Sequence, residues 1–186
     1  MSKMSMFFNR VPLFSCFSGN SESCEELLPL NGAVRKEPVI LNVYDLFTIN
    51  EYVTPLGLGI FHTGIQVYGT EYTFGGHSLS NTGIFELAPR SAQQELGQNF
   101  RYRESIHLGH THLSRDEVRR LVEQLGWQFR GNSYHLTSHN CNHFSDAMSR
   151  ILCGRQIPGW INRLAHFVGC VPFLERCLPP DWLTPM

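Results

Sequence analysis

The sequence predicts an α+β domain in which helices pack against an antiparallel sheet. Two observations carry this prediction. Runs of β-branched and aromatic residues, separated by turn residues, fill positions 39–109, and apolar residues recur at helical spacing from Ser114 onward. A chain of 186 residues with 42% hydrophobic and 17% charged side chains also has the size and composition of a self-sufficient globular domain.

The predicted strands follow one another closely in the first part of the chain. Gly69-Thr70 joins two of them and gives a hairpin signal, while a loop containing Pro89 separates the last two. Short connections of this kind favour antiparallel pairing. The predicted strands cover residues 39–46, 59–69, 71–76, 82–87 and 102–109.

The first predicted helix begins at Ser114, which forms a capping-box pair with Glu117. Its apolar residues recur every three or four positions, as expected for a helix with one buried face. They are Val118, Leu121, Val122, Leu125 and Phe129. Gly131 then breaks the pattern, and residues 134–137 are expected to be short and extended.

Two further helices are predicted near the end of the chain. Asn140 is suited to the N-cap of the first, and Gly154 is placed to end it. Its predicted apolar face consists of Phe144, Ala147, Met148, Ile151 and Leu152. The second begins at Trp160, with Leu164 and Phe167 at i+4 and i+7, and a Pro-rich stretch follows from Cys177.

Two segments of different character divide the chain near Glu37. Residues 1–36 collect Ser, Asn, Gly and charge without sustained periodicity, whereas regular apolar patterning starts at Pro38. A segment without an apolar face cannot offset the entropy of ordering its backbone. We therefore expect residues 1–36 to be a disordered N-terminal segment and residues 37–186 to form the folded domain.

Charge and cysteine usage exclude several classes of protein. Fifteen basic and sixteen acidic side chains leave a net charge of -1, so a dedicated nucleic-acid binder is not expected. No apolar run approaches the roughly 18 residues of a membrane span. The cysteines lie in two distant groups, a spacing that favours reduced thiols. They are Cys16, Cys24, Cys141, Cys153, Cys170 and Cys177.

The N-terminal residues make a poor signal peptide because Pro12, Ser15 and Ser18 interrupt the short apolar patch. We expect a cytoplasmic protein, with the nucleus as an additional compartment. A basic, Ser-containing start with no acidic residue before Glu22 leaves an organellar transit peptide as a second interpretation.

Cys141 is the candidate nucleophile. It occupies the first turn of a predicted helix, where the partial positive charge of the helix N-terminus favours the thiolate, the nucleophilic form. It also lies three residues before Phe144 and seven before Met148, so its side chain is expected on the inward face. The alternative is a small buried hydrophobe, the commoner role of an unpaired cysteine.

His62 is the candidate general base among nine histidines. A nucleophilic cysteine needs an imidazole to take its proton and later protonate the leaving group. His62 lies in a predicted strand between Gly59 and Gly64, where small residues let another chain segment or a substrate backbone approach. The alternative is a structural histidine in a sheet.

A metal site is the competing interpretation of the same region. His139, Cys141 and His143 would share a face if their segment were extended. The helical pattern that begins inside this string disfavours that arrangement, and the histidines at 107, 110 and 112 are interpreted as an exposed strand end. We therefore expect neither a metal nor another cofactor.

Four stretches of the sequence resemble the PPPDE family, the permuted papain-fold isopeptidases known as DeSI proteins. The likeness runs from about Pro38 to Pro185, and the motifs occur in the family's order. They are LNVYDL (41–46), GIFHTGIQVYGTEYTFGGH (59–77), GIFEL (83–87) and SYHLTSHNCNHFSDAMSRILCGRQIPGWINRLA (133–165). In that family the histidine precedes the cysteine, so the resemblance implies a permuted papain-like fold and a dyad of His62 and Cys141.

The resemblance also implies an activity. Family members remove SUMO or ubiquitin from lysine, so conjugates of these modifiers are the expected partners of a thiol peptidase that works through a thioester intermediate. Thioesterase activity on acylated cysteine, such as S-depalmitoylation, is an alternative that uses the same dyad. A non-catalytic module that binds a ubiquitin-like tail is the alternative from another class.

Overall fold

The computed structural model describes residues 36–46, 50 and 59–170, with side chains described as far as His166. The predicted disorder of the N-terminal segment and the Pro-rich stretch after Cys177 lie outside the described residues. No helix in the described part of the chain is both long enough and apolar enough to cross a membrane.

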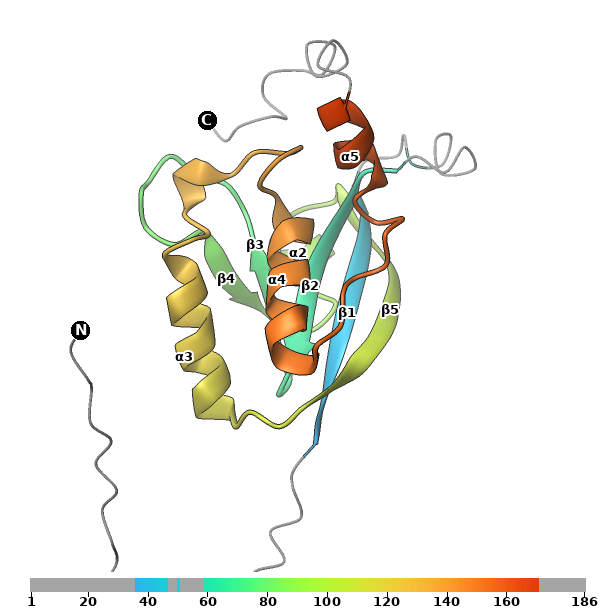
Figure 1. Ribbon diagram of the computed structural model, residues 1–186. Coiled ribbons are helices and arrows are strands. Elements are labelled where there is room, and N and C mark those ends of the chain that lie inside the picture. The colour runs from blue at the N-terminus through green and yellow to red at the C-terminus, as the bar shows by residue number, and fades with distance from the viewer. Residues whose placement is uncertain (1–35, 47–49, 51–58, 171–186) are drawn as a thin grey trace, which may run out of the picture. The chain divides into compact units, whose positions relative to one another are not determined.

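Five antiparallel strands form one sheet in the order β4-β3-β2-β1-β5 (Figure 1). A two-residue turn connects β2 to β3 and the longer segment 75–83 connects β3 to β4, whereas β1 and β5 pair across a long sequence separation. The prediction of an α+β domain with an antiparallel sheet is confirmed. The strands are β1 (Glu37–Leu46), β2 (Phe61–Val67), β3 (Thr70–Phe74), β4 (Ile84–Leu87) and β5 (Phe100–Thr111).

The predicted hairpin joins β2 to β3, but its turn lies one residue earlier than expected. Tyr68 and Gly69 occupy the turn with positive φ angles of 52° and 75°, and Thr70 already belongs to β3. Two successive residues with positive φ are typical of the tight turn whose twist matches that of antiparallel strands.

The first two predicted helices are confirmed by their caps. The helix α3 (Arg115–Gly126) follows Ser114, whose capping box with Glu117 is complete. The helix α4 (Cys141–Cys153) follows Asn140, and Gly154 ends it in the left-handed conformation with φ of 68°. Because these caps satisfy amide groups that the helix leaves unpaired, they fix where each helix starts and stops.

Three local predictions differ from the structure. Residues 134–137 do not form a strand: after the 3-10 helix η2 (Gly131–Ser133), a turn is closed by mutual 2.9 Å backbone hydrogen bonds between His135 and His139. A short helix, α2 (Ala92–Glu95), lies in the loop that follows Pro89. The last helix, α5 (Arg163–Cys170), begins after Trp160, because residues 160–162 form a turn.

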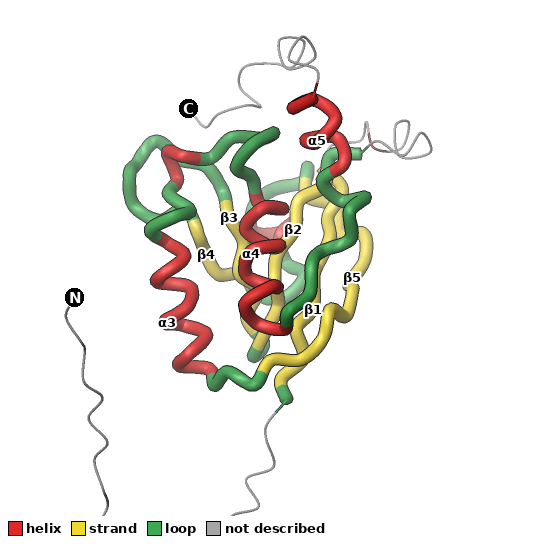
Figure 2. Tube along the Cα trace, viewed as in Figure 1, coloured by secondary structure: helices red, strands yellow, loops and turns green. Residues whose placement is uncertain are grey.

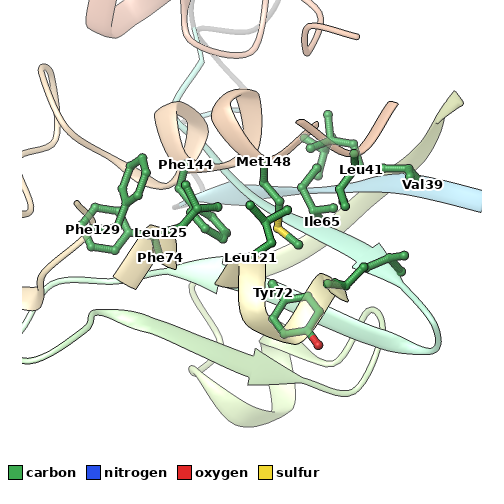
Figure 3. Packing of buried hydrophobic residues seen from close by; sticks show 14 of the residues in the cluster. Val39, Leu41, Ile65, Tyr72, Phe74, Leu121, Leu125, Phe129, Phe144 and Met148 are labelled. Atoms are coloured by element: carbon green, nitrogen blue, oxygen red, sulfur yellow. The ribbon is translucent and has the colours of Figure 1, made fainter. Parts of the chain in front are cut away.

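Hydrophobic side chains form a core on each face of the sheet. The helices α3 and α4 cover one face (Figure 1, Figure 2), where Phe144 of α4 packs against Phe129 and Met148 lies near Ile65 of β2 (Figure 3). A smaller cluster around Tyr44 and α2 covers the other face. Ile151, predicted on the buried face of α4, is instead 52% exposed.

A polar layer accompanies the smaller core. Glu71 of β3 is fully buried. Its carboxylate accepts hydrogen bonds from Asn42 Nδ2 at 2.6 Å, from Tyr44 Oη at 2.8 Å and from the Arg90 amide at 2.9 Å. Burial raises the pKa of Glu71. The carboxylate thus ties β1, β3 and the segment after β4 together on the face opposite α4.

Gly64→Ala should destabilise the fold because Gly64 of β2 leaves the space that the Glu71 side chain fills. A Cβ at position 64 would lie 2.4 Å from Glu71 Oε1, whereas a Cβ at Gly159 meets nothing within 4 Å. We expect Gly64→Ala to lower the unfolding free energy by about 1–3 kcal/mol, measured by urea denaturation. Gly159→Ala is the matched control, and an equal change in both variants would contradict this account.

Candidate active site

Cys141 is the first residue of α4 and is only 2% exposed. The Asn140 side-chain oxygen caps the helix by accepting from the amides of Asn142 at 3.0 Å and His143 at 3.1 Å. Because this cap takes the second and third amides of the helix, the Cys141 amide stays outside it. The nucleophile candidate therefore has its thiol at a helix terminus where the Cys141 N–H is outside the Asn140 cap.

The Cys141 sulfur lies against the backbone of β2. It is 3.9 Å from the carbonyl oxygen of Phe61, and it accepts a hydrogen bond from the Thr63 backbone N–H. Asn142 reinforces this junction, since its Nδ2 donates to Phe61 O at 3.1 Å and its Oδ1 accepts from the Thr63 hydroxyl at 2.9 Å. The first turn of α4 is thus fastened to the residues on either side of His62.

Tyr134 is a second group at the sulfur. Its side chain hydrogen-bonds to the Cys141 thiol, and its ring packs against Phe74 with centroids 5.1 Å apart. Burial, together with the neighbouring thiol, raises the pKa of Tyr134 far enough to keep the hydroxyl protonated. Tyr134 therefore acts as a hydrogen-bond donor beside the nucleophile.

The His62 side chain projects from the opposite face of β2. Thr63 directs its hydroxyl to α4, where it also bonds Ser145 at 2.9 Å, so the neighbouring His62 points away from α4. There the imidazole is 4% exposed. Its Nε2 lies 2.8 Å from Thr73 Oγ1, and its ring contacts Phe100 edge-on at 5.0 Å.

The structure brings the two predicted residues to the same stretch of β2 but not into hydrogen-bond contact. Cys141 touches the main chain of Phe61 and Thr63, and His62 lies between these residues with its ring on the other face. The catalytic dyad of His62 and Cys141 therefore stays a prediction. Catalytic hydrogen bonds are often long or unaligned without substrate and tighten in the complex.

Burial keeps both groups neutral at pH 7. It raises the pKa of the Cys141 thiol to about 11, although hydrogen bonds from Thr63 and Tyr134 lower it. Burial also lowers the pKa of His62 to about 4. The thiolate stabilisation expected from the helix N-terminus is outweighed by desolvation in this state.

A small hollow lined by residues of β2, α4 and α5 reaches Cys141. Apolar side chains form most of its wall, and the polar part includes Thr137 and the amide side chains of Asn140, Asn142 and Asn162. The apolar residues are Ile60, Phe61, Leu136, Ile161, Leu164 and Ala165. A substrate approaching through this hollow meets the thiol next to the N-terminus of α4.

Asn162 links these amides and was not indicated by sequence reasoning. Its Oδ1 accepts from Asn140 Nδ2 at 3.0 Å and from Asn142 Nδ2 at 3.2 Å. Its Nδ2 lies 3.3 Å from His143 Nε2. The only sequence signal was its place in the WINRLA motif, which carries no information about this contact.

The histidines near Cys141 have other roles than metal binding. His139 stacks on Phe129 with ring centroids 4.7 Å apart, and His143 completes the capping box with Asn140. The three members of the string therefore face in different directions. Within the described ranges, no three His, Cys, Asp or Glu residues are grouped to hold a metal ion.

The stability of the protein should depend on pH through His62. The unfolded histidine binds a proton near its ordinary pKa of 6.5, whereas the folded one stays neutral down to about 4. The unfolded state thus holds more protons in this window, and falling pH favours unfolding. We expect a loss of roughly 3 kcal/mol of unfolding free energy between pH 6.5 and 4 that His62→Gln lacks.

Urea denaturation across this pH range measures the effect, with the exposed His112→Gln as the matched control. If the unfolding free energy of the unchanged protein and of His62→Gln changed equally with pH, His62 would not be held neutral in the folded state.

Tyr134→Phe should raise the pKa of the Cys141 thiol further, because it removes a donor that stabilises the thiolate. We expect iodoacetamide to alkylate Cys141 about 3- to 10-fold more slowly at pH 8. Mass spectrometry of the Cys141 peptide measures the rate, with the Cys153 peptide as an internal control. An unchanged pH midpoint of alkylation in Tyr134→Phe would rule out the hydrogen bond.

Several curated proteins are similar to this chain. A desumoylating isopeptidase 1 homolog from Caenorhabditis elegans is 47% identical over 175 residues, which cover 94% of this chain and 52% of that protein. A DeSI-like protein from Arabidopsis thaliana is 40% identical, covering 92% of this chain and 71% of the relative. Human desumoylating isopeptidase 1 is 32% identical over a stretch that covers 76% of this chain and 83% of the human protein. The chain thus spans about half the length of the nematode relative.

The PPPDE putative peptidase domain matches residues 37–182 of this chain. This range contains both His62 and Cys141 and all strands and helices described above. Given this match and the extent of the similar proteins, the chain belongs to the PPPDE peptidase family.

Proposed function

We propose that this protein is a cysteine isopeptidase that removes SUMO or ubiquitin from lysine side chains, with Cys141 as nucleophile and His62 as general base. The observation that carries the proposal is the Cys141 thiol at the N-terminus of α4, where the Cys141 amide is outside the Asn140 cap and a hollow reaches the sulfur. Family membership supports a peptidase, and several relatives are named desumoylating isopeptidases. We expect its substrates in the cytoplasm and the nucleus.

The chemistry is an acyl transfer through the Cys141 sulfur. The thiol gives its proton to His62, and the sulfur forms a bond to the isopeptide carbonyl carbon. The bond from that carbon to the lysine nitrogen then breaks as His62 returns the proton to the leaving amine. Water activated by His62 hydrolyses the thioester, which releases the modifier and restores the thiol.

The N-terminus of α4 supplies donors for the oxyanion that forms during attack. The Cys141 N–H is outside the Asn140 cap, and the Tyr134 hydroxyl is beside the sulfur. Donors fixed in a buried site stabilise charge that develops in the transition state more strongly than water does. The thiol and imidazole are not in hydrogen-bond contact at rest, so the proposed mechanism requires substrate binding to bring them together before the proton moves.

Hydrolysis of an S-acyl thioester is the second candidate function. The apolar wall formed by Ile60, Leu136 and Leu164 favours it, because an acyl chain gains free energy by leaving water for such a surface. The chemistry at Cys141 would be the same, with a cysteine thiolate as the leaving group. A fluorogenic S-acyl substrate distinguishes this activity from isopeptide cleavage.

Probes that carry a ubiquitin, SUMO1 or SUMO2 C-terminal electrophile test the proposal. We expect a covalent adduct with at least one modifier, detected by intact mass, that Cys141→Ala abolishes and Cys153→Ala retains. A non-catalytic module would bind the modifier without forming an adduct. The absence of any adduct from the folded protein would contradict the proposal.

The substrate for this test is a lysine conjugate of the modifier whose probe reacts with Cys141. On this substrate His62→Gln should lower kcat by about 10²- to 10⁴-fold, because proton transfer to and from the reacting groups is lost. Single-turnover kinetics with circular dichroism as a folding check measure this effect. His110→Gln, on β5, is the matched control. Turnover by His62→Gln near the rate of the unchanged protein would remove His62 from the mechanism.

A further inference from the structure

The Thr73 hydroxyl determines which nitrogen of His62 carries the proton. Thr73 Oγ1 lies 2.8 Å from His62 Nε2 and 2.8 Å from the Thr63 carbonyl oxygen. A carbonyl oxygen only accepts hydrogen bonds, so the single hydroxyl hydrogen of Thr73 points to Thr63. Thr73 Oγ1 then has only lone pairs for the imidazole, and Nε2–H must be the donor.

The other imidazole nitrogen, Nδ1, is buried and has no hydrogen-bond partner among the described residues. The aromatic neighbours of the imidazole are Phe100, with ring centroids 5.0 Å apart, and Tyr44, with centroids 6.1 Å apart. A buried acceptor without a partner is unusual in a folded protein and often marks a functional group.

The strand register places Thr73 for this role. Thr73 of β3 pairs with Gly64 of β2, so His62 is its diagonal neighbour on the same face of the sheet. Because the β-branched Thr73 has restricted χ1 freedom, its hydroxyl is held in one direction.

We propose that Thr73 is a positioning residue that fixes the Nε2–H tautomer of His62 and leaves Nδ1 as the nitrogen that accepts the Cys141 proton. This inference rests on the proposed function, in which His62 is the general base. A third group that orients the imidazole is a general part of nucleophile–base pairs. After Nδ1 takes the thiol proton, the Nε2–H bond to Thr73 persists and orients the imidazolium.

Thr63 is hydrogen-bonded both to Thr73, the partner of His62, and to Cys141. Its carbonyl accepts from Thr73, its N–H donates to the Cys141 sulfur, and its hydroxyl bonds Asn142 of α4. A displacement of β3 at Thr73 is therefore transmitted through one residue to both the imidazole and the thiol.

Nitrogen-15 NMR of the full chain with labelled histidine tests the tautomer directly, with the His62 signals assigned by their loss in His62→Gln. We expect a protonated Nε2 and an unprotonated Nδ1 at pH 7. Finding the proton on Nδ1 in the unchanged protein would by itself overturn the proposal.

Thr73→Val removes the hydroxyl while keeping the shape, and Thr73→Ser keeps the hydroxyl. We expect Thr73→Val to lose the single Nε2–H tautomer and to lower kcat by roughly 10- to 100-fold, with KM changed less than about twofold. Thr73→Ser should restore both the tautomer and kcat. A Thr73→Val protein with an unchanged tautomer and unchanged kcat would overturn the role of Thr73.

The two proposals fail in different ways. If Cys141→Ala retains full activity or no probe reacts, the proposed function fails, but the NMR experiment still reports whether Thr73 sets the His62 tautomer. If probes react through Cys141 and the tautomer is Nδ1–H, the function stands and the role of Thr73 is rejected.

Discussion

The divergence of β3 from β2 is the constraint on which the site depends. Pairing between these strands starts only at Gly64 and Thr73, so the backbone groups of Phe61 and Thr63 need other partners. The first turn of α4 supplies them through the Asn142 amide and the Cys141 sulfur. Buried main-chain groups must be paired, and meeting this requirement brings the N-terminus of α4 to the strand that carries His62.

Burial dominates the electrostatics of the resting site. A helix N-terminus favours a thiolate, but the effect amounts to about a kcal/mol, whereas complete desolvation of a charge is several times larger. Cys141 therefore holds its proton and His62 remains neutral. A site of this kind differs from one with a preformed ion pair, and in the proposed mechanism the charge separation would accompany substrate binding.

Sequence reasoning identified the features that depend on local interactions. Asn140 and Gly154 marked the ends of α4 because caps act within one helical turn, and strand periodicity located the strand of His62. Ile151 was misassigned because its exposure is set by what packs on α4 and not by the helix itself. The start of α5 was misplaced because Asn162 bonds to Asn140 and Asn142 of a distant segment.

The residues that contact the two candidate catalytic residues could not be predicted from the sequence. Thr73 meets His62 only through the β2–β3 register, and Tyr134 meets Cys141 only after the turn at 135–139 has folded. Nothing in the local composition distinguishes these residues from other strand threonines or core tyrosines. Sequence patterns therefore predicted the two candidate catalytic residues, while the groups that contact them depend on tertiary structure.

The enclosure of Cys141 has a consequence for its chemical durability. Peroxides oxidise the thiolate of accessible cysteines to sulfenic acid, so reactivity toward them depends on ionisation and exposure together. The Cys141 thiol is only 2% exposed and is protonated, so it has neither the exposure nor the ionisation that this reaction needs. The resting protein should thus withstand oxidants that inactivate peptidases with an exposed thiolate, and its sensitivity to oxidation should be confined to the interval in which a substrate has opened the site.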